Sequence, residues 1–153
     1  MHKALKLIIS IIACQLAGII GSVFTASSVS TWYATLNKPF FNPPSWLFGP
    51  VWTTLYLLMG ISLYLLWEKR ARTVITLFII QLGLNTLWSI CFFGLKNPLL
   101  AFVEILVLWG AIIITIFSSY KVSKAAAYLL IPYILWVTFA AILNFYIFWL
   151  NPL

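Results

Sequence analysis

Residues 125–150 read AAAYLLIPYILWVTFAAILNFYIFWL and contain no charged side chain. This run exceeds the roughly 20 apolar residues that a helix needs to cross a bilayer. The whole chain has the same character, because 64% of its 153 residues are hydrophobic and only 7% are charged, with a mean hydropathy of +1.10. A typical soluble domain is about 25% charged. The composition therefore excludes a soluble enzyme, a disordered chain and a soluble nucleic-acid-binding protein.

Charged residues divide the chain into five apolar segments. We expect one domain, residues 1–153, that folds as an all-α integral membrane bundle of five transmembrane helices. The predicted spans are about 5–26, 45–67, 73–95, 97–120 and 125–150. The first segment also has the cationic start and small residues of a cleavable signal peptide, but its length and Gln15 favour an uncleaved helix.

The distribution of cations predicts the orientation of the bundle. Five spans place the N-terminus and the second and fourth connections on one side, with seven Lys and Arg residues, whereas the other side has only Lys38 and Lys96. The positive-inside rule then predicts a cytoplasmic N-terminus and an outside C-terminus. The net charge of +7 on so apolar a chain indicates the lipid bilayer, and not nucleic acid, as the partner.

The longest connection, residues 27–44 on the predicted outer side, is a candidate lid. Thr31 can cap a short helix in which Trp32 and Leu36 share one face. Long ordered loops in compact proteins frequently cover a binding site. The alternative is an aromatic belt in the lipid headgroup region, and one loop can serve both purposes.

Polar and aromatic residues from four spans recur at one depth. Trp52, Trp88 and Glu104 each lie seven residues from the outer end of their spans, and Asn144 lies six residues from it. At 1.5 Å per residue, this depth is about 10 Å below the outer boundary. Apolar walls with a few convergent polar groups are typical of a ligand cavity, so we expect one in this layer, under the loop.

Helical spacing extends this layer into stripes that should face the bundle interior, because polar groups in lipid are costly. The stripes are Gln81, Asn85, Trp88, Ser89 and Phe92 in the third span, Pro132, Trp136, Ala140 and Asn144 in the fifth, and Trp52 and Tyr56 in the second. The alternative is that the amides only join neighbouring helices. In the first span, Gly18 and Gly21 belong to a small-residue stripe that allows close packing within the chain or between copies.

Glu104 is the sole carboxylate within a predicted span. One interpretation is a proton-coupled site or a hydrogen-bond acceptor for a ligand. The other is a group that is neutral through burial, or hydrogen-bonded to Asn144 or a tyrosine, and the shallow depth favours this second interpretation. Cys14 and Cys91 lie in apolar runs, which indicates buried hydrophobic positions and not a disulfide or metal site. With no Asp in the chain and only the terminal His2, Ser-His-Asp chemistry is excluded and no metal site is expected.

Several stretches resemble the TspO/MBR family of tryptophan-rich sensory and translocator proteins. They are WYATLNKP at 32–39, PPSWLFGPVW at 43–52, LYLLMG at 55–60, QLGLNTLWSICFF at 81–93 and LIPYILWVTFAAILN at 130–144. The resemblance implies a five-helix membrane bundle, often a homodimer, that binds tetrapyrroles such as protoporphyrin IX beneath the first loop. It implies a site lined by Tyr33, Trp52, Tyr56, Asn85, Trp88, Ser89, Phe92, Trp136 and Ala140. The lid and depth arguments add Trp32 and Asn144.

We therefore expect a tetrapyrrole-binding membrane protein that acts as a sensor, carrier or scavenger, with porphyrin as ligand and no required cofactor. Metal-free porphyrin is favoured over haem, because no histidine lies inside the bundle to ligate iron. Lys38 is near enough to the outer surface to meet porphyrin carboxylates. Sterol binding at the end of the last helix is not expected, because no cation follows Tyr146.

Two alternative functions remain open. The resemblance implies light-dependent porphyrin breakdown with Trp52 and Trp136 as partners, which would make the protein an enzyme. A proton-coupled small-molecule transporter centred on Glu104 is the other alternative. The short chain predicts a bacterial plasma membrane as the location, with an organellar membrane as the alternative.

Overall fold

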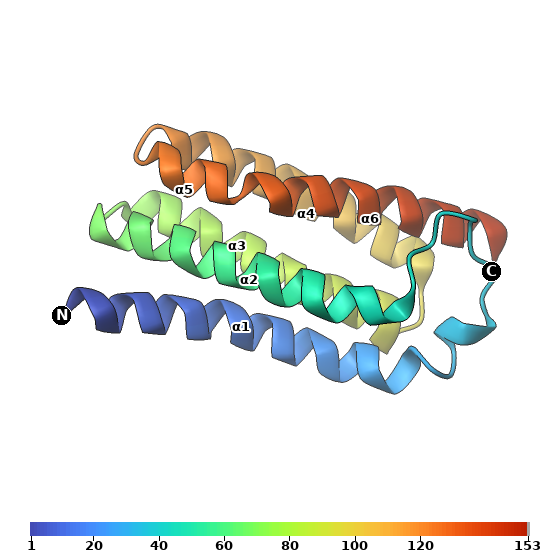
Figure 1. The fold of residues 1–153 in the computed structure, drawn as a ribbon. Helices are drawn as coiled ribbons and strands as arrows, with labels where there is room; N and C mark the ends of the chain where they lie inside the picture. Colours follow the sequence, from blue (N-terminus) through green and yellow to red (C-terminus); the bar gives the residue numbers. More distant parts are fainter. Residues whose placement is uncertain (153) are drawn as a thin grey trace.

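The computed structural model describes residues 1–152, and in this part of the chain all regular elements are helical (Figure 1). In chain order they are α1 (Lys3–Ser28), the 3₁₀ turn η1 (Tyr33–Thr35), α2 (Ser45–Glu68), α3 (Arg72–Ser89), the π-helical turn η2 (Ile90–Gly94), α4 (Pro98–Tyr120), α5 (Lys124–Leu129) and α6 (Ile131–Leu150). Five segments are long and apolar enough to span a membrane: α1, α2, α3 with η2, α4, and α5 with α6. The predicted all-α architecture with five spans is confirmed.

The axes of the five segments are roughly aligned, successive segments cross the bundle in opposite senses, and together they form three layers (Figure 1). Helix α1 packs on α2 and α3, α4 packs on α3 and α6, and α5 packs on α2 and α4. In Figure 1, α1 forms one side of the bundle, α2 and α3 lie in the middle, and α4 to α6 form the other side. The termini lie at opposite ends, as an odd number of spans requires. The cytoplasmic location of the N-terminal end stays a prediction.

Two of the predicted spans contain a local break with an identifiable cause. The last span is divided at Leu130, because Pro132 has no N–H and its ring conflicts with a continuous helix. The third span ends in η2, where the Leu95 N–H donates to the Ile90 carbonyl at 2.7 Å in a wide turn. Within η2 the consecutive residues Phe92 and Phe93 are both buried.

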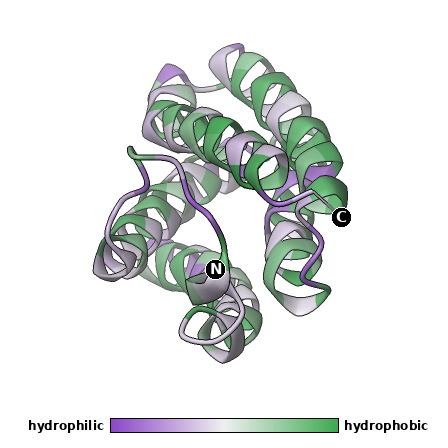
Figure 2. Cartoon of the chain, turned by 90° about the vertical axis from the view of Figure 1, so that its right-hand side faces the viewer, coloured by the Kyte–Doolittle hydropathy of each residue, from purple (hydrophilic) through white to green (hydrophobic). Residues whose placement is uncertain are grey.

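The half of the bundle nearer the N-terminus has a filled aliphatic and aromatic core. Met59, Leu66, Phe78 and Ile112 have no exposed surface. Helix α1 approaches the backbone of α2 closely there, since Gly60 has no side chain. A Cβ added at Gly60 would lie only 2.6 Å from the Ile11 Cα. Viewed along the bundle, the helices are mostly hydrophobic (Figure 2). Their outward apolar faces match a lipid environment.

Candidate ligand-binding site

The opposite half of the bundle contains a cavity of about 410 Å³ beneath the loop 29–44. Its walls come from α1, α2, α3, η2 and α6, with Tyr33 of η1 above them. This volume is within the range of small-molecule sites. Since helices far apart in sequence share the cavity, its shape depends on how the whole bundle packs.

The structure brings most of the predicted site residues to this cavity. The lining includes Tyr33, Trp52, Tyr56, Asn85, Trp88, Ser89, Phe92, Trp136, Ala140 and Asn144. Trp32 is not part of the lining; its ring packs edge-on against that of Phe92, which does line the cavity, with ring centroids 5.6 Å apart. Its contribution is therefore support for Phe92.

Two stacked aromatic pairs form the flat surfaces of the site. Trp52 stacks on Tyr56 with ring centroids 5.6 Å apart, and Trp88 stacks on Phe92 at 5.1 Å. The Trp136 ring stands perpendicular to Trp52 at 6.4 Å. Aromatic faces of this kind bind other flat π systems by stacking and edge-to-face contacts.

Hydrogen bonds between helices fix several of these rings in place. The Tyr56 hydroxyl donates to Asn85 Oδ1, Asn85 Nδ2 donates to the Tyr133 hydroxyl at 2.9 Å, and that hydroxyl donates to Gln81 Oε1 at 2.8 Å. Asn85 thus joins α2, α3 and α6 while it lines the cavity. Asn85 therefore both joins neighbouring helices and lines the cavity, so the two interpretations of this amide do not exclude each other.

Asn144 likewise lines the cavity and joins neighbouring helices. Its Oδ1 accepts from Trp88 Nε1 at 3.0 Å, and its Nδ2 donates to the Pro98 carbonyl at 2.8 Å. The bond orients the Trp88 indole and ties α6 to the start of α4. Because these atoms already have protein partners, Asn144 acts first as a support for the wall.

One buried donor at the wall remains free. Trp136 Nε1 is buried and has no hydrogen-bond partner among residues 1–152. An indole N–H normally finds a partner when it is buried. Trp136 lines the cavity, but its Nε1 has no exposed surface, so an acceptor on a ligand would reach this N–H only after a neighbouring side chain moves.

The loop 29–44 closes the end of the site and is anchored at several points. Tyr33 is 4% exposed and its hydroxyl donates to Asn42 Oδ1 at 2.8 Å. Burial raises the pKa of Tyr33 to about 12, against a smaller lowering by the Asn42 bond, so the phenol is neutral at ordinary pH. The Lys38 ammonium lies 4.7 Å from the centre of the Tyr33 ring. These contacts hold the loop beside the cavity, and its role as a lid stays a prediction.

A second anchor joins the loop to the C-terminal end of α6. The Asn37 N–H donates to Asn151 Oδ1 at 2.9 Å, and Asn151 Nδ2 donates back to the Asn37 carbonyl at 2.8 Å. Phe41 packs edge-on against Tyr146 at 5.4 Å. The loop therefore rests on the helix that also supplies Trp136.

Helix α1 supplies lining residues that the sequence patterns assigned to packing. Gly18, Ser22, Thr25 and Ala26 belong to the lining, together with Ile19, which is 56% exposed. Gly18 leaves room for the Tyr56 ring, with which a Cβ would collide. Gly18 belongs to the predicted small-residue stripe, whereas no sequence pattern indicated Ile19, Thr25 or Ala26. Since exposed α1 residues also line the cavity, the wall between α1 and α2 faces the bilayer.

Glu104 does not join the cavity, although its predicted depth matched that of Trp52 and Trp88. Its side chain is 8% exposed, and neither carboxylate oxygen has a partner within residues 1–152. Of the alternatives for Glu104, the bond to Asn144 is absent there, because that amide bonds Trp88 and Pro98, whereas the burial is present. Equal depth did not determine which way the α4 side chain points.

Known proteins similar to this chain agree with the motif resemblance. The family model described as "TspO/MBR family" matches residues 10–150. A tryptophan-rich protein TspO from Archaeoglobus fulgidus is 55% identical over 150 residues, which cover 96% of this chain and 97% of that protein. The human translocator protein is 39% identical, with 88% of this chain and 83% of the relative covered, and a tryptophan-rich sensory protein from Cereibacter sphaeroides is 36% identical over 74% and 73%. The chain belongs to the TspO/MBR family, and it is an integral membrane protein.

Proposed function

We propose that the protein binds a metal-free tetrapyrrole of the protoporphyrin IX type in the cavity under the loop 29–44. The observation that carries this proposal is the pair of stacked aromatic walls, Trp52 on Tyr56 and Trp88 on Phe92, around a cavity of about 410 Å³. A planar macrocycle gains about 0.5–1.5 kcal/mol per aromatic contact beyond the burial of its area.

Polar groups at the site suit the edges of such a ligand. The unpaired Trp136 N–H would donate to an acceptor atom on the macrocycle or its side chains if ligand entry moves the side chains that cover it. Lys38, in the loop above, supplies a positive charge for a propionate carboxylate at the membrane surface. A bound tetrapyrrole would enter from the bilayer between α1 and α2, where Ile19 and Ala26 border the cavity.

With this site the protein would act as a sensor, carrier or scavenger of tetrapyrroles in the cell membrane. The sensory and translocator names belong to relatives, and both roles begin with reversible capture of a ligand. We further propose that the protein works as a homodimer in a bacterial plasma membrane.

A fluorescence titration tests the proposal. Protoporphyrin IX added to the protein in nanodiscs should quench tryptophan emission saturably, and Trp52→Ala or Trp136→Ala should weaken binding by about 1–3 kcal/mol. Trp149→Ala is the matched control, because this indole is 67% exposed and lies outside the cavity lining. Unchanged affinity in both cavity variants would place the ligand elsewhere.

The contact between Trp52 and Trp136 favours a second candidate function, light-dependent breakdown of the bound porphyrin. Both indoles line the cavity and lie 6.4 Å apart, so either could exchange an electron with an excited ligand. Illumination of the aerated complex should produce a new absorbance band that Trp136→Phe loses while it retains binding. A band of equal size in that variant would exclude a photochemical role for Trp136. Glu104 lies outside the cavity lining, so the geometry does not favour transport centred on it.

A further inference from the structure

The half of the bundle near the N-terminus has a groove on its surface that the cavity does not reach. The groove measures about 240 Å³ and is lined by Ile9, Ser10, Ala13, Leu63, Trp67, Ile75 and Ile79. These residues belong to α1, α2 and α3, and none of them lines the cavity under the loop. Ile9 and Ile79 are 39% and 50% exposed, so the groove opens toward the bilayer.

One polar atom in the groove has no partner. Ser10 is 1% exposed, and its hydroxyl makes no hydrogen bond within residues 1–152. A serine in a membrane helix usually satisfies its hydroxyl, because lipid tails offer no acceptor. The Ser10 oxygen has no exposed surface, so an acceptor on a bound molecule, such as the ester carbonyl of a lipid, would reach the hydroxyl once a neighbouring groove side chain moves aside.

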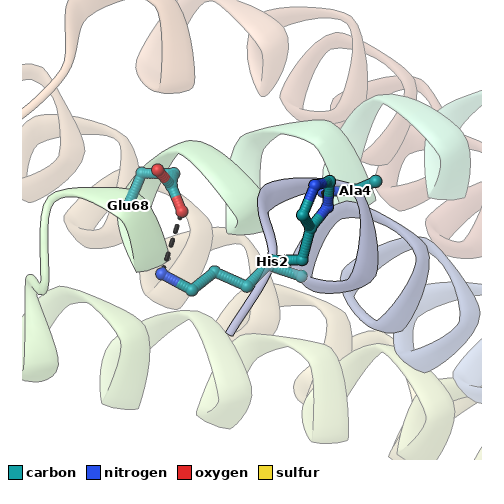
Figure 3. A network of polar contacts seen from close by, with 4 residues as sticks. His2, Ala4 and Glu68 are labelled. Carbon is teal, nitrogen blue, oxygen red and sulfur yellow. Dashed lines mark hydrogen bonds and ion pairs between the residues drawn. The ribbon is translucent and has the colours of Figure 1, made fainter.

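Lysine and arginine residues of α1 and α3 continue two walls of the groove toward the N-terminal end of the bundle. Lys3, Lys6, Ser10 and Ala13 follow helical spacing on one face of α1, and Arg72, Ile75 and Ile79 do so on α3. The Lys6 ammonium is 2.9 Å from Glu68 Oε1, the contact dashed in Figure 3, and lies 5.8 Å from the Trp67 ring. Glu68 carries one negative charge, paired with Lys6 and also facing the charge of Lys3, so Lys3, Lys6 and Arg72 together leave an excess of positive charge at this end.

We propose that this groove binds one anionic glycerophospholipid of the bilayer leaflet at the N-terminal end. One acyl chain would fill the space between Ala13 and Ile79, the Ser10 hydroxyl would donate to an ester carbonyl, and the phosphate would lie between Lys3 and Arg72. Apolar walls below and cations above match the two parts of such a lipid. This site is independent of the tetrapyrrole cavity.

Native mass spectrometry of the protein released from nanodiscs tests this proposal. The nanodiscs contain equal palmitoyl-oleoyl phosphatidylglycerol and phosphatidylcholine. The protein should retain one phosphatidylglycerol with a preference of about 10-fold or more over phosphatidylcholine, as charge-assisted hydrogen bonds predict. Equal retention of the two lipids would overturn the proposal.

Variants separate the parts of the lipid site. Ser10→Ala, which keeps the groove open, should weaken retention about 2- to 10-fold. Lys3→Gln with Arg72→Gln should remove the headgroup preference, whereas Lys121→Gln with Lys124→Gln, on another connection at the same end, should preserve it. Ala13→Leu should block the groove, and Gly110→Leu is its control, because a Cβ at Gly110 meets nothing within 4 Å.

The same spectra report the alternative occupant, a second copy of the chain. If Ala13→Leu converts a dimer mass to a monomer mass without changing lipid retention, the groove is a protein interface and the lipid proposal is wrong. Unchanged phosphatidylglycerol retention in both Ser10→Ala and the double variant Lys3→Gln with Arg72→Gln would also overturn the proposal. None of these substitutions introduces a larger side chain into the groove.

Discussion

The two halves of the bundle are built from the same five helical segments and differ in how closely these approach. Near the N-terminal end, Gly60 lets α1 touch α2 through its backbone, and Met59, Leu66 and Phe78 fill the centre completely. Near the loop 29–44, large rings and hydrogen-bonded amides surround a cavity of about 410 Å³. We call the half near the N-terminal end the closed half and the half near the loop 29–44 the open half. The packed core of the closed half stabilises the fold, whereas the open half has space for a ligand. Core substitutions near the N-terminal end should therefore change stability and leave ligand binding intact, whereas hydrogen-bonded residues of the cavity wall can affect both.

The largest effect on stability is expected in the closed half. Phe78→Ala removes a side chain with no exposed surface and should lower the free energy of unfolding in detergent by about 3–5 kcal/mol. Porphyrin affinity of the folded fraction should change little. Ile80→Ala, two residues along the same helix and 53% exposed, is the control and should change stability by less than about 0.5 kcal/mol. Equal losses in the two variants would contradict the division into halves.

The contact between α1 and α2 should be the next most sensitive feature. Gly60→Ala places a methyl group 2.6 Å from the Ile11 Cα, so the two backbones must separate at a cost of about 1–3 kcal/mol. Thermal unfolding of the purified variant measures this. Gly83→Ala is the matched control, since a Cβ there meets nothing within 4 Å, and it should be neutral or slightly stabilising.

A substitution at Asn85 tests whether the hydrogen bonds around the cavity also stabilise the fold. Asn85→Ala removes the acceptor of the Tyr56 hydroxyl and the donor to Tyr133, which should cost about 1–3 kcal/mol in unfolding free energy. Ser89→Ala, a cavity residue on the next turn, should leave stability unchanged. If Asn85→Ala weakened only porphyrin binding, the amide would be a ligand contact and not a support for the wall.

The smallest effect is expected where the loop meets α6. Asn151→Ala removes two hydrogen bonds to the Asn37 backbone and should speed porphyrin release about 2- to 10-fold, with little change in thermal stability. Stopped-flow displacement measures the release rate. Thr35→Ala, whose hydroxyl bonds only within the loop, is the control. A release rate equal to that of the unchanged protein would show that this anchor does not hold the cover closed.

Much of the site could be predicted because depth along a membrane helix follows directly from residue count. Trp52, Trp88 and Asn144 were placed at one level by counting 1.5 Å per residue, and they line one cavity. Glu104 was placed at that level by the same count but lies outside the lining. Counting fixes height, whereas the direction of a side chain around the helix axis depends on which neighbours the helix packs against.

Trp32 and Phe93 show the same limit at the loop and at η2. Trp32 is expected at the ligand, but it lies outside the lining and packs against the Phe92 ring. Phe93 was not predicted, and the wide turn of η2 brings it to the cavity beside Phe92. A change of one backbone hydrogen-bond register is invisible in hydrophobic periodicity.

The amino-acid sequence is enough to specify the membrane environment, the five spans, the clustering of seven cations at one end and the aromatic layer at the other. These properties follow from composition, the length of apolar runs and the rise of a helix. Only the tertiary structure decided that Asn85 and Asn144 bond neighbouring helices, that α1 forms a wall of the cavity and that Glu104 stands apart from it. Those outcomes depend on which side chains meet across helices, and a hydrogen bond or a void is defined only once both of its sides are in place.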